Sequence, residues 1–182
     1  MAATERRSFI GMLLAGLSSF SLGDDALADS TRAGVKVAAN EDHFGKSRSV
    51  GFNSTAFKVG SADTQGALFA MEQHSLKPGG PPLHLHYEQD EFWYVISGRY
   101  VFQVGSERYH AQAGDCLLGP REVPHAYAFV GRSNGRILVG FTPAGKIQDY
   151  FERPRKPGTY VADADLYRAY GMKLLGPPLS LR

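Results

Sequence analysis

The stretch from Gly79 to Gly98 constrains this chain more than any other, because it carries three potential metal-binding side chains in two short extended runs. His84 and His86 lie two positions apart, so in a β-strand both imidazoles point to the same face. Glu91 opens the next extended run and can face the two histidines if the runs form a hairpin. His125, after a strand-like run that a proline interrupts, is a fourth candidate. Imidazole nitrogens and a carboxylate oxygen together suit a divalent transition metal.

These residues and their spacing resemble the two sequence signatures of the cupin superfamily. The first signature matches Gly79-x4-His84-x-His86-x4-Glu91-x6-Gly98, and the second matches Gly114-x5-Pro120-x4-His125. The chain departs from the usual pattern in having one residue fewer after the first glycine, and in Glu122 and Phe129, where glycine and asparagine are usual. The resemblance implies a β-barrel and a metal site whose ligands are His84, His86, Glu91 and His125.

Short apolar runs separated by many turn residues predict the rest of the fold. The 182 residues include 21 glycines and 10 prolines, and they suffice for one domain with a sizeable core. Regular turn signals between short strands favour a small barrel or jelly roll. The resemblance makes this expectation more specific and implies an all-β double-stranded β-helix, the cupin jelly-roll barrel, over residues 51–145. A polar arm or linker at 29–50 precedes it, and a tail at 146–182 packs short C-terminal helices on the barrel.

Aromatic residues alternate with the expected ligands along several strands and predict the walls of a substrate pocket. Each alone is better explained by core packing, but together they suit a flat aromatic or apolar substrate. Both faces of the 91–96 run are apolar beyond Glu91, which predicts a strand buried on both sides. The five pocket candidates are Trp93, Tyr100, Phe102, Tyr127 and Phe129.

Motifs outside the ligand signatures resemble one particular group within the cupin superfamily. They resemble the single-domain, quercetin 2,3-dioxygenase-like cupins over roughly residues 55 to 180. The resemblance implies a metal-dependent dioxygenase of quercetinase type acting on a phenolic or enolisable small molecule, with O2 as co-substrate and Glu91 as ligand and general base. The motifs are Asp63-Thr64-x-Gly66, residues 78–82, Thr142-Pro143-Ala144-Gly145 with Tyr150-Phe151, and Tyr170-Gly171-Met172 with Gly176-Pro177-Pro178.

Two other functions fit the same residues. One is a non-oxidative metal-dependent isomerase or lyase, and the other is a non-catalytic cupin that binds a small molecule. The ligand set does not select the cofactor, since manganese, iron, cobalt, nickel, copper and zinc all accept it. A homodimer that exchanges the arm at 29–50 is compatible with the sequence.

The first 28 residues resemble an export signal. Arg6 and Arg7 precede a mildly apolar run from Phe9 to Leu22, and Ala26-Leu27-Ala28 offers a cleavage site. The arginine pair resembles the twin-arginine pattern, which implies an exported, periplasmic or secreted protein. The apolar run is too short and too polar for a stable membrane span.

Charge and cysteine content restrict the partners further. The formal net charge is only +2, and the charges are scattered without a basic stripe, so nucleic-acid binding has little support. Cys116 is the only cysteine, which rules out an internal disulfide. Its strand-like surroundings predict a small buried residue.

Overall fold

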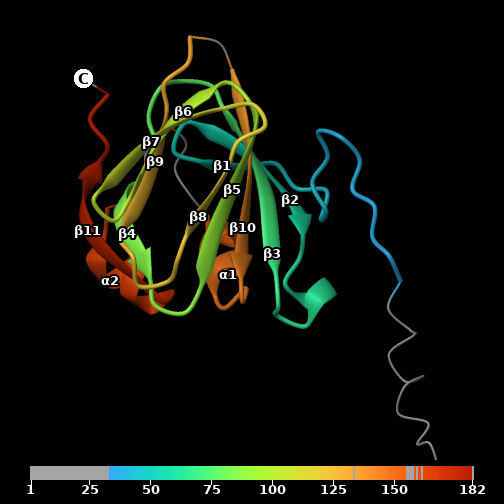
Figure 1. Ribbon diagram of the computed structural model, residues 1–182. Helices are drawn as coiled ribbons and strands as arrows, with labels where there is room; N and C mark the ends of the chain where they lie inside the picture. Colours follow the sequence, from blue (N-terminus) through green and yellow to red (C-terminus); the bar gives the residue numbers. More distant parts are fainter. Residues whose placement is uncertain (1–32, 133, 155–157, 159, 161, 182) are drawn as a thin grey trace, which may run out of the picture. The chain divides into compact units, whose positions relative to one another are not determined.

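The structure is a computed structural model, and we describe residues 33–132, 134–154, 158, 160 and 162–181 of it (Figure 1). The expected export signal at 1–28 lies outside these residues. Among those described, every helix falls short of the length and apolar character that a membrane span requires.

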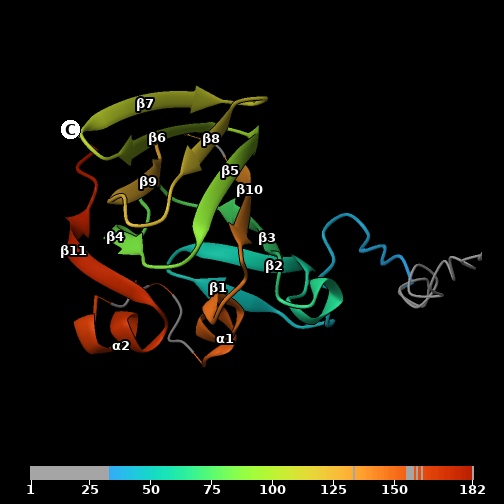
Figure 2. The ribbon, with the colours of Figure 1, turned by 60° about the horizontal axis from the view of Figure 1, so that its bottom comes forward.

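Two antiparallel sheets form the body of residues 34–182 and face each other as a double-stranded β-helix, as expected (Figure 2). The six-stranded sheet has the order β1 (Arg48–Val50), β2 (Asn53–Val59), β3 (Phe69–Ser75), β10 (Gly135–Thr142), β5 (Asp90–Ser97) and β8 (Cys116–Gly119). The five-stranded sheet has the order β11 (Met172–Pro178), β4 (Pro82–His86), β9 (His125–Phe129), β6 (Arg99–Val104) and β7 (Glu107–Gln112).

Alternation along the strands fills the space between the sheets with large side chains. In β5, Trp93 and Val95 are fully buried. The opposite face of the same strand is not buried as expected, because Tyr94 points outward and is 43% exposed. Cys116 likewise contradicts the prediction of burial, since it lies exposed on the edge strand β8.

Two short helices, α1 (Ile147–Glu152) and α2 (Ala164–Ala169), lie at one end of the barrel (Figures 1 and 2). The Asp163 carboxylate accepts a hydrogen bond from the backbone N–H of Leu166 and caps α2. Tyr150 of α1 and Tyr167 of α2 pack edge to face, with ring centroids 5.8 Å apart. The short C-terminal helices thus close this end of the barrel.

The end of the tail differs from the helical tail expected at 146–182. After Gly171, whose φ of 77° stops the helix, residues 172–178 form β11 and pair antiparallel with β4. Met172 stands opposite His86, and Leu174 stands opposite His84. The alternation in Met172–Leu175 is too short to have predicted this strand, and two prolines at its end fit an edge position. The barrel also begins at Arg48, in β1, rather than at residue 51.

Candidate metal centre

Three strands bring the four predicted ligand residues together inside the barrel. His84 and His86 point inward from β4, Glu91 lies near the start of β5, and His125 is the first residue of β9. All four residues are buried, and none is more than 7% exposed. The two-residue period of β4 therefore places both imidazoles on one face of the strand, and this face points into the barrel.

The candidate ligand atoms lie close to one another. Glu91 Oε2 lies 3.1 Å from His125 Nε2, 3.3 Å from His86 Nε2 and 3.9 Å from His84 Nε2. One donor atom from each of the four residues lies within 4.8 Å of every other. Because ligands sit about 2.0–2.2 Å from a transition metal, donors this close can share one ion.

The Nδ1 atom of each imidazole, which faces away from the cluster, has a hydrogen-bond partner of its own. His84 Nδ1 lies 2.8 Å from the Pro82 carbonyl oxygen, and His125 Nδ1 lies 2.9 Å from that of Val123. His86 Nδ1 lies 3.2 Å from Gln89 Oε1. Since these partners only accept, each Nδ1 donates to its partner, and each Nε2 faces the cluster as the nitrogen that could bind a metal.

The electrostatics of the cluster fit a bound cation. His86 Nε2 is buried and has no hydrogen-bond partner among the described residues. Burial lowers the pKa of His84 to about 3, assisted by His125 and His86, so this imidazole is neutral. Burial alone would raise the pKa of Glu91, but contacts with His125 and His86 outweigh it and hold the pKa well below its usual range. A neutral His84 and an ionised Glu91 are the protonation states that metal binding requires of these two residues.

Gln89 supports the cluster and was not identified from the sequence. Its side chain is buried beneath Gly145, and a Cβ at that glycine would come within 1.7 Å of Gln89 Nε2. Gly145 also has a φ of 52°, which disfavours other residues. The only sequence signal was the glycine that ends Thr142-Pro143-Ala144-Gly145.

A small cavity of about 40 Å³ adjoins the cluster. Of the five predicted pocket residues, Tyr127 lines it. The other four are buried in the core of the barrel and do not line this cavity: Trp93, Tyr100, Phe102 and Phe129. Three of the four ligand residues, His84, His86 and Glu91, line the cavity. The amide Gln73 lines it as well, together with further apolar and tyrosine side chains, namely Val50, Met71, Pro81, Phe141, Ile147, Tyr150, Phe151, Tyr160, Tyr167 and Met172.

A chain of polar groups crosses the wall of this cavity. Gln73 Oε1 accepts hydrogen bonds from the Tyr127 hydroxyl and, at 3.1 Å, from Asn53 Nδ2. Asn53 Nδ2 also donates to the Tyr160 hydroxyl oxygen at 3.1 Å. Burial raises the pKa of both tyrosines above the ordinary value, so both hydroxyls stay protonated. The cavity thus offers neutral hydrogen-bonding groups close to the ligand cluster.

Comparison with known proteins supports the cupin superfamily. Residues 73–141 match the family model of the cupin domain. An uncharacterized protein of Methanocaldococcus jannaschii is 30% identical over 67 residues, which are 37% of this chain and 54% of that protein. The chain thus matches about half the length of this relative.

Two solved structures have a similar fold. KdgF from a Halomonas species is 16% identical, with a TM-score of 0.53 over 61% of this chain and 94% of that one. An RmlC-like cupin from Shewanella frigidimarina is 18% identical, with a TM-score of 0.51 over 64% and 96% of the two chains. The match to the cupin domain and the buried cluster together support a metal-binding cupin. The four residues do not determine which metal it binds.

Proposed function

We propose that this cupin is a metal-dependent dioxygenase acting on a small phenolic or enolisable molecule. The convergence of three imidazole Nε2 atoms and one carboxylate oxygen carries the proposal, because it leaves room for further ligands on a five- or six-coordinate ion. Such an ion supplies Lewis acidity and, if redox-active, electrons for reaction with O2.

Glu91 is the residue best placed to move a proton. Its lowered pKa keeps the carboxylate ionised at neutral pH, and it borders the cavity that would hold the substrate. A substrate hydroxyl beside a cation has a lowered pKa, so a carboxylate of modest basicity suffices to accept its proton. The protonated Tyr127 and Tyr160 hydroxyls and the Gln73 amide line the cavity and can orient substrate oxygens.

The size of the cavity favours a small substrate. Pockets for drug-sized ligands measure about 300–1,000 Å³. The cavity beside the cluster holds about 40 Å³, so a flavonol would require its walls to move. A compact enolisable molecule such as a β-diketone fits this arrangement better.

Oxygen uptake with a defined metal tests the proposal. The chain is stripped of metal, loaded separately with iron, manganese, cobalt, nickel or copper, and supplied with acetylacetone or quercetin. We expect uptake with at least one redox metal. In that case Glu91→Gln should lower the rate by about 10²- to 10⁴-fold without unfolding the protein, whereas exposed Glu88→Gln should not. No uptake with any of these metals would reject the proposal.

The second candidate is a non-oxidative isomerase or lyase. The small cavity suits this candidate as well as it suits a dioxygenase, because the cavity restricts the size of the substrate and not the type of reaction. Product formation from a small substrate without O2, with zinc as effective as iron, would support this candidate. Binding without turnover, unchanged by Glu91→Gln, would instead indicate a binding protein.

We also propose that residues 1–28 direct export by the twin-arginine route. The arginine pair, the apolar run and the small-residue cleavage site support this. Cell fractionation of the protein with its native N-terminus should recover a shortened form outside the cytoplasm. Replacement of both arginines by lysine should retain it inside.

A further inference from the structure

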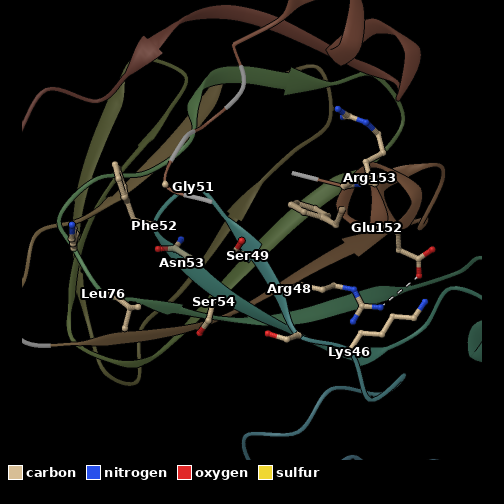
Figure 3. A pocket seen from close by; sticks show the side chains of 15 residues that line it. Lys46, Arg48, Ser49, Gly51, Phe52, Asn53, Ser54, Leu76, Glu152 and Arg153 are labelled. Atoms are coloured by element: carbon tan, nitrogen blue, oxygen red, sulfur yellow. Dashed lines mark ion pairs between the residues drawn. The ribbon is translucent and has the colours of Figure 1, made fainter. Parts of the chain in front are cut away.

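A second and much larger hollow lies on the outside of the barrel, between β1 and the end of α1 (Figure 3). Its volume is about 690 Å³, within the range of small-molecule sites. None of the four ligand-cluster residues lines it, and it shares only the wall residue Phe151 with the small cavity. We refer to this hollow as the β1 groove; its lining includes Lys46, Arg48, Ser49, Phe52, Asn53, Ser54, Leu76, Lys77, Phe151, Glu152 and Arg153.

Arg48 presents an unused donor to the β1 groove. Its side chain is only 8% exposed, its Nη1 pairs with Asp42, and its guanidinium lies 3.9 Å from the centre of the Phe57 ring. These contacts fix the guanidinium in place. Its Nη2 is buried and has no hydrogen-bond partner in the described parts of the chain. A buried guanidinium nitrogen that lacks a hydrogen bond is costly even when the charge is paired elsewhere, as here with Asp42, which points to a ligand that accepts from Nη2.

Glu152 faces this donor without satisfying it. Its Oε1 lies 3.9 Å from Arg48 Nη2, too far for a hydrogen bond, and accepts instead from Gln148 Nε2 at 3.1 Å. The Glu152 side chain is 37% exposed, so it can turn toward solvent. Figure 3 shows both side chains on the same side of the groove, with Lys46 beside them.

The other lining residues define the class of ligand. Four basic residues line the groove against one acidic residue, so it favours an anion. Phe52 and Leu76 are 40% and 56% exposed, and Lys77 Nζ lies 5.8 Å from the centre of the Phe52 ring. This end of the groove therefore suits a flat apolar group.

We propose that the β1 groove is a binding site for an aromatic carboxylate, separate from the metal centre. The carboxylate accepts from Arg48 Nη2 and lies near the Lys46 ammonium, while the ring extends along the groove toward the end that Phe52 and Leu76 line. Glu152 acts as a competing anion that the ligand displaces. The site requires no metal, so it can be tested independently of the proposed catalytic function.

Calorimetric titration of the full chain with benzoate tests this site. EDTA in the buffer prevents a metal at the cluster from binding the carboxylate. We expect one site, with benzoate bound at least about tenfold more tightly than neutral benzamide, because charged partners strengthen hydrogen bonds to arginine. Absence of binding at millimolar benzoate, or equal affinity for benzamide, would overturn the proposal.

Charge variants with opposite expected effects locate the site. Lys46→Gln should weaken benzoate binding about threefold, and Glu152→Gln should tighten it by about the same factor, as for exposed charge pairs. Arg48→Lys should abolish binding, provided that circular dichroism shows a folded protein. Lys173→Gln, which changes an exposed lysine of β11 outside the groove, should have no effect. Weaker binding in Glu152→Gln would contradict a competing anion and overturn the proposal.

Discussion

His84 of β4 and His125 of β9 stand directly opposite each other in the antiparallel pairing of these strands. Their rings lie 4.8 Å apart, centre to centre, at an interplanar angle of 70°. Each strand has a further neighbour, because β11 pairs with β4 and β6 pairs with β9. The backbone of four strands therefore fixes the separation of the two imidazoles, as a preformed metal site requires.

Replacing His125 should therefore abolish stable metal binding. His125→Ala removes a donor whose Nε2 lies 3.1 Å from Glu91 Oε2, and we expect affinity to fall by more than about 100-fold, the upper range for loss of a supporting group alone. Elemental analysis after dialysis measures the metal retained. His74→Ala is the matched control, because His74 pairs with Glu72 away from the cluster. Full metal content in His125→Ala would show that the cluster is not the metal site.

Adding one methyl group at Gly145 should weaken the metal site indirectly. The new Cβ would displace Gln89, which holds His86 Nδ1, and loss of such a partner lowers metal affinity by about 10- to 100-fold. The left-handed backbone adds roughly 1–2 kcal/mol of destabilisation. Competition with a chromophoric chelator measures the affinity.

Gly66→Ala separates these two effects. Gly66 also has a positive φ, of 82°, but a Cβ there meets nothing within 4 Å. It should therefore show similar destabilisation and unchanged metal affinity. Equal affinities in both alanine variants would mean that Gln89 does not position His86.

The metal-free protein should lose stability as the pH falls from about 6.5 toward 3. Burial lowers the pKa of His84 from 6.5 to about 3. Between these pH values the imidazole is protonated in the unfolded chain and neutral in the folded chain, so a falling pH favours the unfolded chain. The loss should reach on the order of 4 kcal/mol. The lowered pKa of Glu91 acts in the same direction below its ordinary value of 4.5.

Urea unfolding in EDTA at several pH values measures this loss. His84→Asn should flatten the pH dependence, whereas His110→Asn should not, because His110 is exposed on β7. If the unfolding free energy of the parent protein depended on pH as little as that of His84→Asn, His84 would not be the source of the pH dependence.

Only part of the ligand arrangement follows from local rules. Alternation along a strand fixes the shared face of His84 and His86. The expected hairpin between their run and the Glu91 run does not form, because β4 and β5 lie in different sheets and Glu91 meets the histidines across the space between them. The turn before His125 also conforms to the resemblance, since Glu122, where glycine is usual, adopts a φ of 63°. Glu91 and His125 reach the cluster through the facing of the two sheets and the β4–β9 pairing, so their place in it rested on the resemblance and not on local rules.

Features that depend on distant contacts could not be predicted. Gln89 supports His86 only because Gly145, far along the chain, packs against it. Residues 172–178 become a strand because β4 offers a free edge, which local propensity does not reveal. Exposure of Tyr94 and Cys116 likewise depends on what covers the outer face of the sheet.

Alanine substitutions of the adjacent β5 residues Trp93 and Tyr94 test whether the Trp93 side chain stabilises the core or lines the substrate pocket. Trp93 is fully buried, with its ring centre 5.3 Å from Phe102 and 5.4 Å from His125. Trp93→Ala should therefore cost about 3–5 kcal/mol of unfolding free energy. Tyr94→Ala should cost less than about 1 kcal/mol, because this residue points outward. Urea denaturation measures both values. If Trp93→Ala changed substrate affinity while leaving stability intact, Trp93 would be a pocket residue after all and the assignment to the core would be wrong.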